Sequence, residues 1–599
     1  MAGENLSRTH QSGCEAPDAV GAETLDRLTQ VWFTETRAEV TGAPAVTDDA
    51  LYFGDWSGRI YSLDRVTGDE RWSRDLPVHP TVYAGQVTAS PAIAEIDGTE
   101  VVVIASGKTV WALRADDGEP LWNTEFGEIG NDEDPTEIQG SPAVAGDLVI
   151  VPTDVHNDQD RRAGLIALSL ADGEEQWRWD PEEGKPSAGC GSIWGAPSVD
   201  LEGRLVVVGT ASCFEEETWN EYSEAIVGVD LDTGKPRWSY QPRKELSAQD
   251  WDFAGAPNLF TIGDRKVAGL GSKDGHYYVV DRSDGELVWK AEAIKQVADD
   301  DGFAFGGFIG ATALAPDGDG RLVVAGGTAV GDCPCQHGFD AATGEALWQS
   351  PDAGGTYGAS GAAGGVVFTS GIDQTLRAYD LATGEVQWEA VLSSISASGP
   401  SIAGDFLAIG VGFREPGTDA PPSGGVQAFR VLAEGEEPPP SSTTTLPEGP
   451  AVTAIQDSDQ DCIGAPCDLS FTLKPPPAGL TPTMTLEIDP DPLQITVRTT
   501  GLGAPEQWLG DEGAAKDAGA TVFAVFITPR DDKPELGSIL CVLGRDGSCT
   551  GDQIDLRADS YTRLSLLALV DEETPPLIQE GFDRLVTTQS FDPGLVPAS

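Results

Sequence analysis

The chain has 599 residues, of which 98 are Asp or Glu and only 37 are Lys or Arg, so its formal net charge is -61. Such an acidic surface repels phosphate backbones and anionic lipids, which excludes nucleic acid as an expected partner. No apolar stretch reaches the roughly 20 residues of a membrane-spanning helix. A hydrophobic content of 40% with 15 Trp excludes global disorder, and the length predicts more than one domain or a repeat architecture.

A repeated unit organises the first two thirds of the chain. Each copy is an apolar run, a turn containing Asp and Gly, and a Gly-x-x-x-Trp ending, as in IYSLDRVTGDERW and LRAYDLATGEVQW. The unit predicts one β-hairpin, and the spacing of its tryptophans, from 40 residues to 61, fits a four-stranded propeller blade. We interpret these side chains as structural wedges between blades, at Trp72, Trp122, Trp177, Trp238, Trp289, Trp348 and Trp388.

Short segments of small residues precede the hairpins. Six contain Pro, as in GAPAV from Gly42, and Gly310 to Ala313 and Ala359 to Ala362 fill the two remaining places. Small residues suit innermost strands, where blades crowd the axis. The last hairpin strand, GGVQAFRVL from Gly424, has no Trp after it, and Trp32 supplies the missing one. We therefore predict an all-β fold with an eight-bladed propeller over residues 1–433, closed by the N-terminal strand.

The composition changes abruptly after the propeller. Residues 434–450 are acidic and rich in Pro, Ser and Thr, which predicts a solvated linker. Beyond it, alternating apolar and polar residues from Leu469 to Leu473 and from Leu493 to Arg498 predict strands. We expect residues 451–599 to form an immunoglobulin-like β-sandwich, whose target the sequence does not identify.

Nine cysteines, several in close pairs, favour an oxidising compartment. Met1 opens onto a polar segment without a signal-peptide core, so we expect a secreted or cell-envelope protein whose signal peptide is absent from this sequence. Cys14 has no assigned partner. The disulfide candidates are Cys190, Cys213, Cys333, Cys335, Cys462, Cys467, Cys541 and Cys549.

The Gly-x-x-x-Trp hairpin resembles the tryptophan-docking motif of the pyrroloquinoline quinone (PQQ) quinoprotein propellers, a group that includes assembly factors without a cofactor. Three stretches, GCGSIWGAPSVD, SYQPRKELSAQDWDFAGAPNLF and GSKDGHYYVVDR, are similar to the alcohol dehydrogenase branch and its polyvinyl alcohol dehydrogenases. The resemblance implies that Trp194, next to Gly195, stacks on PQQ. It also implies that Asp252 is the catalytic base and a metal ligand, and that Lys273 bonds to the quinone oxygens.

Two departures from that family concern its calcium site. The stretch GTASC places Ser212 where the family has a metal-binding Asn, and only Asp158 or Asp160 lies near the place of a metal-binding Glu. Calcium takes six to eight oxygen ligands. The resemblance therefore implies PQQ with a weak calcium site at Asp252 and Ser212, and the sequence contains no haem motif.

Two functions stay open. The chain is an exported oxidoreductase acting on a small alcohol or a polymer, or it is a cofactor-free scaffold that binds a protein partner or polymer in the envelope. Each site residue also has a structural interpretation: Trp194 packs near the axis, Asp252 pairs locally, and Lys273 is a solvated turn residue. We expect a monomer in either case.

Overall fold

The computed structural model describes side chains in residues 6–8, 10–12, 18–79, 85–127, 136–155, 163–182, 191–212, 219–245, 249–295, 306–329, 335–350, 354–413, 424–433 and 435–436, and backbone strands from 442 to 591. The chain divides into two units, Met1–Thr444 and Thr445–Ser599. The described part contains one short 3-10 helix, η1 (Ala22–Arg27), and otherwise strands. None of its helices is long and apolar enough to span a membrane.

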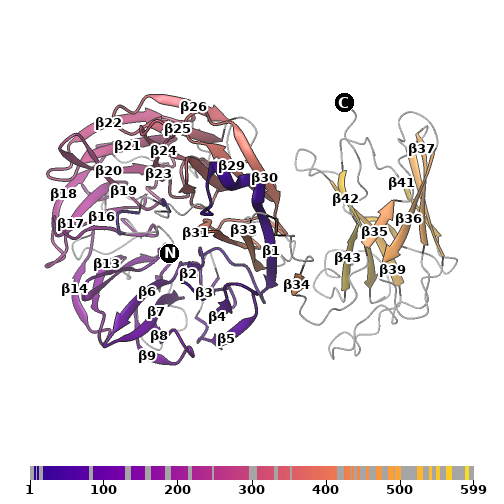
Figure 1. Cartoon of the computed structure of the whole chain (residues 1–599), viewed down its shortest axis with the longest axis horizontal. Helices are drawn as coiled ribbons and strands as arrows, with labels where there is room; N and C mark the ends of the chain where they lie inside the picture. Colours follow the sequence, from indigo (N-terminus) through magenta and orange to yellow (C-terminus); the bar gives the residue numbers. More distant parts are fainter. Residues whose placement is uncertain are drawn as a thin grey trace. The chain divides into compact units, whose positions relative to one another are not determined.

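Eight sheets form the blades of a propeller in the first unit, arranged as a ring in Figure 1, which confirms the predicted fold. Blades 1 to 4 contain β2 (Ala45–Val46), β3 (Ala50–Gly54), β4 (Arg59–Asp64) and β5 (Glu70–Asp75); β6 (Ala92–Ile96), β7 (Thr99–Ser106), β8 (Thr109–Arg114) and β9 (Pro120–Glu125); β10 (Thr136–Glu137), β11 (Ala143–Ala145), β12 (Leu148–Val155), β13 (Gly164–Ser169) and β14 (Glu175–Trp179); and β15 (Ser198–Asp200), β16 (Leu205–Gly209), β17 (Ile226–Asp230) and β18 (Pro236–Tyr240). Blades 5 to 8 contain β19 (Asn258–Ile262), β20 (Arg265–Gly271), β21 (His276–Asp281) and β22 (Leu287–Glu292); β23 (Ala313–Pro316), β24 (Leu322–Gly327), β25 (Gln336–Asp340) and β26 (Ala346–Ser350); β27 (Gly361–Ala363), β28 (Val366–Ser370), β29 (Thr375–Asp380) and β30 (Val386–Val391); and β31 (Ser401–Ala403), β32 (Phe406–Val411), β33 (Gly425–Val431) and β1 (Leu28–Glu35).

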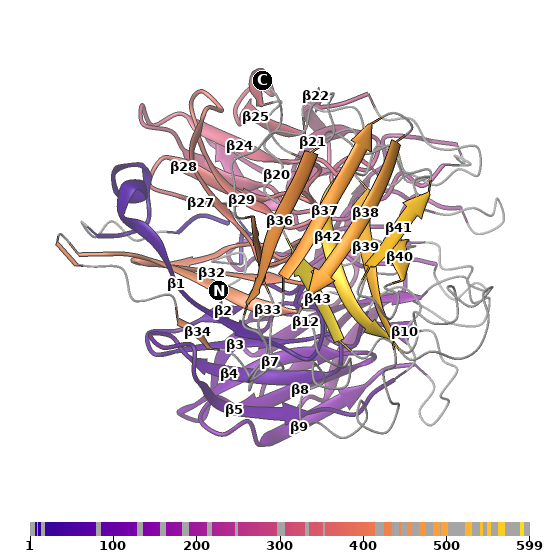
Figure 2. The same cartoon turned by 90° about the vertical axis from the view of Figure 1, so that its right-hand side faces the viewer.

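The N-terminal strand closes the ring, as predicted. Strand β1 pairs antiparallel with β33, with Leu28 opposite Val431 and Trp32 opposite Ala428. The two strands lie side by side in Figures 1 and 2. A short strand, β34 (Ser442–Thr444), pairs with the other edge of β1. Closure by β1 therefore supplies the fourth strand of blade 8, and β34 adds a fifth at its outer edge.

The hairpin motif places each tryptophan against the next blade. In blade 3, the Asp172 carboxylate accepts a hydrogen bond from the amide of Glu174, and Gly173 takes a positive φ of 74°. The indole of Trp122, from blade 2, lies on this glycine and donates its Nε1 hydrogen to Leu170 O at 2.8 Å. Seven indoles make this type of bond: those of Trp32, Trp72, Trp122, Trp177, Trp238, Trp289 and Trp348. Trp388 instead packs edge-on against Phe429 of blade 8.

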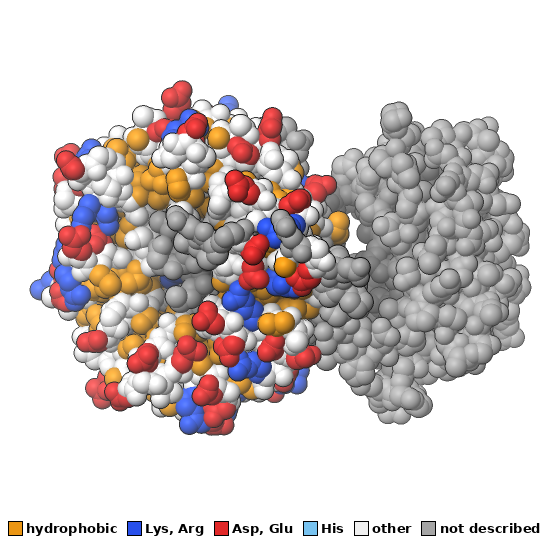
Figure 3. Space-filling model, in the orientation of Figure 1, with side chains coloured by type: hydrophobic (Ala, Val, Ile, Leu, Met, Phe, Trp, Pro, Cys, Tyr) orange, Lys and Arg blue, Asp and Glu red, His pale blue; other side chains and the backbone are white. Residues whose placement is uncertain are grey.

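The surface of the propeller carries its charges in mixed patches. Acidic and basic side chains are interspersed over the face shown in Figure 3. Arg71 pairs with Asp49 at 2.8 Å, and Arg114 pairs with Asp117 at 2.6 Å. Because such exposed pairs contribute at most about 1 kcal/mol each, stability comes mainly from the buried aliphatic and aromatic side chains between blades.

The second unit contains two sheets. One has the order β35 (Thr453–Gln456), β36 (Cys467–Lys474), β37 (Thr483–Pro490), β38 (Leu493–Thr500) and β41 (Ser548–Asp552), and the other has the order β40 (Ile539–Val542), β39 (Val522–Pro529), β42 (Tyr561–Leu569) and β43 (Thr587–Phe591). All pairs are antiparallel. The immunoglobulin-like arrangement of these sheets and the linker bounds 434–450 stay predictions.

Candidate functional site

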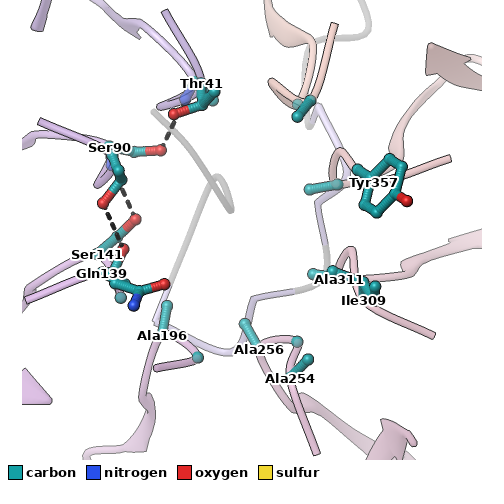
Figure 4. A pocket seen from close by; sticks show the side chains of 18 of the residues that line it. Thr41, Ser90, Gln139, Ser141, Ala196, Ala254, Ala256, Ile309, Ala311 and Tyr357 are labelled. Atoms are coloured by element: carbon teal, nitrogen blue, oxygen red, sulfur yellow. Dashed lines mark hydrogen bonds between the residues drawn. The ribbon is translucent and has the colours of Figure 1, made fainter. Parts of the chain in front are cut away.

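A cavity of about 230 Å³ lies on the axis of the propeller (Figure 4). Every blade contributes the residue two positions before its innermost strand: Ala43, Ser90, Ser141, Ala196, Ala256, Ala311, Ala359 and Gly399. All eight are small because the blades crowd one another here. A Cβ added to Gly195 would lie 2.5 Å from Ala254 O. Larger side chains lie two residues before the small residue of four blades: Gln139, Trp194, Ile309 and Tyr357.

The predicted site residues converge beside the Trp194 indole. Trp194 precedes β15 in blade 4 and Ser212 follows β16 of the same blade, whereas Asp252 precedes β19 and Lys273 follows β20 in blade 5. Trp194 Nε1 donates to Asp252 Oδ2 at 3.2 Å. The Lys273 ammonium lies 5.1 Å from the centre of the Trp194 ring. The structure thus brings together four residues that are widely separated in sequence.

Asp250 completes this group, which we call the Asp-Lys cluster: Asp250, Asp252, Lys273 and Ser212. Lys273 Nζ lies 2.9 Å from Asp250 Oδ2 and 2.9 Å from Asp252 Oδ2. Ser212 donates its amide hydrogen to Asp252 Oδ1 at 2.6 Å, and its hydroxyl lies within hydrogen-bond distance of both carboxylates. All four residues are more than nine-tenths buried. A single ammonium therefore holds two buried carboxylates.

Within the Asp-Lys cluster, the pKa of Asp252 is lowered, whereas the pKa values of Asp250 and Lys273 are raised. Burial alone would raise the pKa of Asp252, but Lys273 and the hydrogen bonds from Ser212 outweigh it and hold this pKa below its usual value. Burial and the neighbouring Asp252 charge raise the pKa of Asp250 to about 6. Burial opposes the charge of Lys273, yet the two carboxylates raise its pKa above the ordinary value. At neutral pH, Asp252 is thus ionised and Lys273 is protonated.

A second charged group supports the segment that carries Asp252. Arg243 donates to Glu224 at 2.7 Å and to Asp274 at 2.6 Å, and it also donates to Trp251 O at 3.3 Å. Burial raises the pKa of Glu224 to about 7 despite the neighbouring Arg243. Because Trp251 directly precedes Asp252, Arg243 positions the backbone of the Asp-Lys cluster.

The sequence missed Asp250 as a member of the site. The only signal was the Asp-x-Asp spacing in QDWDF, where Asp252 alone matched the family pattern. Gly195 lies in the cavity lining, and its role toward a cofactor stays a prediction. Among the described residues, no group of three or more His, Cys, Asp or Glu side chains has a geometry suited to a metal ion.

Several predicted residues lie outside the described part of the chain: Asp158, Asp160, Cys14, Cys190, Cys213 and Cys333. The side chains of Cys462, Cys467, Cys541 and Cys549 also lie outside it. Cys335 is buried and disulfide-bonded. The individual disulfide pairings therefore stay predictions.

The sequence matches the family described as the glucose/ethanol/alcohol dehydrogenase β-propeller domain over residues 15–301. Residues 273–431 match the family described as the outer membrane protein assembly factor BamB. Polyvinylalcohol dehydrogenase from a Pseudomonas species is 25% identical over 470 residues, which cover 65% of this chain and 70% of that protein. Quinohemoprotein alcohol dehydrogenase from Comamonas testosteroni is 25% identical over 319 residues, which cover 45% of this chain and 43% of that protein.

Solved structures that align with most of this chain include two dehydrogenases. The europium-containing methanol dehydrogenase aligns with a TM-score of 0.58 and 18% identity, covering 72% of this chain and 97% of that one. The structure of the Comamonas testosteroni quinohemoprotein alcohol dehydrogenase aligns with a TM-score of 0.57 and 20% identity, covering 73% of this chain and 81% of that one.

Proposed function

Because the first unit is a β-propeller of the PQQ quinoprotein family, we propose that this chain is an oxidoreductase that oxidises an alcohol or polyol with PQQ as its hydride acceptor. The observation that carries the proposal is the buried Asp-Lys cluster against the Trp194 indole. It places an ionised carboxylate and a cation beside the Trp194 indole, and Trp194 itself lines the axial cavity. We also propose that the protein is exported from the cytoplasm.

The residues around Trp194 fit a flat, anionic cofactor. The Trp194 ring is only partly buried and lines the axial cavity, and the Lys273 ammonium lies over it and supplies a positive charge. We expect Trp194 to stack on PQQ and Lys273 to bond to its quinone oxygens. PQQ, when bound, supplies an electrophilic orthoquinone that accepts hydride from the alcohol carbon.

The chain itself supplies the proton chemistry. Asp252 stays ionised at neutral pH, so its carboxylate is ready to remove the hydroxyl proton of the alcohol. Lys273 stabilises negative charge that develops near it during hydride transfer. Asp250 and Ser212 hold Lys273 and Asp252 in place, because each bonds directly to one or both of them. The burial of the cluster excludes water and strengthens these interactions.

The donor set does not fit a calcium ion. Ser212 directs an amide hydrogen at Asp252 Oδ1, and its hydroxyl bridges the two carboxylates. The Lys273 ammonium is bound to a carboxylate oxygen of both Asp250 and Asp252, which gives the two negative charges a cationic partner from the chain itself. We therefore derive no step through a metal ion at Asp252 and Ser212.

The proposal is tested by adding PQQ to the purified full chain, with and without calcium, and following tryptophan fluorescence and the reduction of a dye by simple alcohols and polyvinyl alcohol. We expect micromolar PQQ binding and alcohol-dependent dye reduction. Asp252→Asn should retain PQQ binding but lose about 10²-fold or more in turnover, the range for loss of a general base. Lys273→Met should weaken PQQ binding.

Exposed residues of the same types provide matched controls. Asp264 and Lys266 lie on the surface of blade 5, and Asp264→Asn and Lys266→Met should leave binding and turnover unchanged. An absence of PQQ binding at micromolar concentration would contradict the proposal. That result would favour the second candidate function, a cofactor-free binding scaffold, which the match of residues 273–431 to an assembly-factor family supports.

A further inference from the structure

Residues 6–8 and 10–12, which we call the N-terminal segment, bind along the axial channel of the propeller, and Arg8 and His10 line its cavity. Leu6 O accepts a hydrogen bond from the amide of Val199 at 2.7 Å, and Ser7 O accepts one from Leu259 at 2.9 Å. His10 O accepts one from the amide of Ala362 at 2.7 Å. The segment thus binds the innermost strands of blades 4, 5 and 7.

Arg8 anchors the N-terminal segment. It is only 7% exposed, and its guanidinium donates to the backbone carbonyls of Pro142 and Pro197. Burial lowers the pKa of Arg8 to about 10, so the side chain is still protonated at neutral pH. Backbone carbonyls attract a cation and repel a carboxylate. The channel wall therefore suits a basic side chain at this position.

Asn258 forms a hydrogen bond with the backbone of Arg8. Its Nδ2 donates to Arg8 O at 2.6 Å and to Thr312 O at 2.9 Å, while its Oδ1 accepts hydrogen bonds from Tyr277 and Thr312. The side chain is fully buried. Because every hydrogen-bonding position of this amide is used, Asn258 is held in one orientation toward the segment.

The N-terminal segment closes one side of the axial cavity. The cavity is lined by residues that precede the inner strands, such as Ala196 and Ala256, whereas the segment bonds within those strands, at Val199 and Leu259. Trp194 precedes Ala196 and so lies toward the other side. Arg8 and His10 belong to the cavity lining, and His10 Nε2 is buried without a hydrogen-bond partner in the described part of the chain.

We propose that the axial channel is a peptide-binding site, occupied in cis by the chain's own N-terminal segment, which plugs the channel on the side away from Trp194. The site selects a peptide with a basic side chain at the position of Arg8 and with the turned backbone of the segment, in which Arg8 and His10 take positive φ values of 49° and 51°. The inference does not depend on the proposed oxidoreductase activity, because it rests on contacts outside the Asp-Lys cluster. It predicts that displacing the plug exposes a site for the same peptide in trans.

The test uses hydrogen exchange at the amides of Val199, Leu259 and Ala362 in the full chain. Arg8→Glu places a carboxylate against the carbonyls of Pro142 and Pro197, so these amides should exchange at least tenfold faster than in the wild type. Adding a synthetic peptide of residues 1–17 should restore their protection in the variant. The same peptide with Glu at position 8 should not.

Arg71→Glu is the matched control, because it reverses an exposed charge on the outside of blade 1 and should leave the three amides unchanged. If Arg8→Glu fails to fold, Arg8→Ala tests the same contact without burying a carboxylate. The proposal is overturned if the three amides exchange equally fast in the wild type and in the folded Arg8 variant. It is also overturned if the wild-type peptide fails to restore protection.

Discussion

The contact between a tryptophan and the next blade predicts a specific cost for adding one methyl group. Gly173 takes a φ of +74° in blade 3, and an added Cβ would lie 2.6 Å from Trp122 Cε3. Gly146, in the same blade, takes a φ of +63°, but an added Cβ would meet nothing within 4 Å. An alanine at either position would have a strained backbone conformation. Only the alanine at position 173 would also clash with the Trp122 indole.

The magnitudes follow from this comparison. A left-handed conformation costs a non-glycine residue about 1–2 kcal/mol, so Gly146→Ala should lower the free energy of unfolding by about that amount. Overpacking a buried contact adds about 1–3 kcal/mol. Gly173→Ala should therefore lower the free energy of unfolding by about 2–5 kcal/mol, because the buried Trp122 ring must shift or lose its hydrogen bond to Leu170.

The assay is denaturant unfolding of both variants, followed by fluorescence, with a double-mutant cycle in a Trp122→Ala background. We expect the additional cost of Gly173→Ala over Gly146→Ala to disappear when the indole is absent. Equal destabilisation by the two alanine substitutions in the wild-type background would refute the reasoning. It would mean that the Trp122 indole can move to accommodate the added methyl group without lowering the free energy of unfolding.

Two further predictions concern ring closure and the Asp-Lys cluster. Trp32 is 1% exposed in the closing strand, so Trp32→Ala should lower the free energy of unfolding by about 3–5 kcal/mol, and a loss below 1 kcal/mol in denaturant unfolding would argue against closure by β1. The pKa of Asp250 is raised to about 6 in the folded chain, so the folded state binds the extra proton between about pH 4 and pH 6, and this contribution to stability is lost as the pH rises through that window. The stability of the wild type relative to Asp250→Asn should then fall by up to about 1.4 kcal/mol per pH unit between those values, and a flat difference in pH-dependent unfolding would contradict the assignment.

The sequence predicts the propeller well because each blade is encoded locally. The turn, the returning strand and its tryptophan lie within about a dozen residues, so each repeat carries its own hairpin signal. Closure by β1 could also be predicted from the sequence, since Trp32 supplied the tryptophan that is missing after the strand from Gly424. The C-terminal unit carries only short alternating runs, which identify strands but not their packing.

The site was predictable only in part. Trp194, Asp252 and Lys273 were found through a family resemblance, and no local pattern predicts that the ends of different strands bring them together. Asp250 was missed because its role depends on the position of Lys273, which follows β20, the second strand after Asp250 in the chain. The channel contacts of Leu6, Ser7 and Arg8 use mostly backbone atoms, which leave no pattern in the side chains.

The pairing of β1 with β33 affects the order of events during synthesis. Because Leu28 emerges from the ribosome early and its partner Val431 emerges after all the other blades, the first strand must wait for the last one. Until then, β1 has an unsatisfied edge that is open to pairing with other chains. Blade 8 is thus the slowest part of the propeller to assemble, and nascent chains that stop before β33 are the forms most exposed to aggregation.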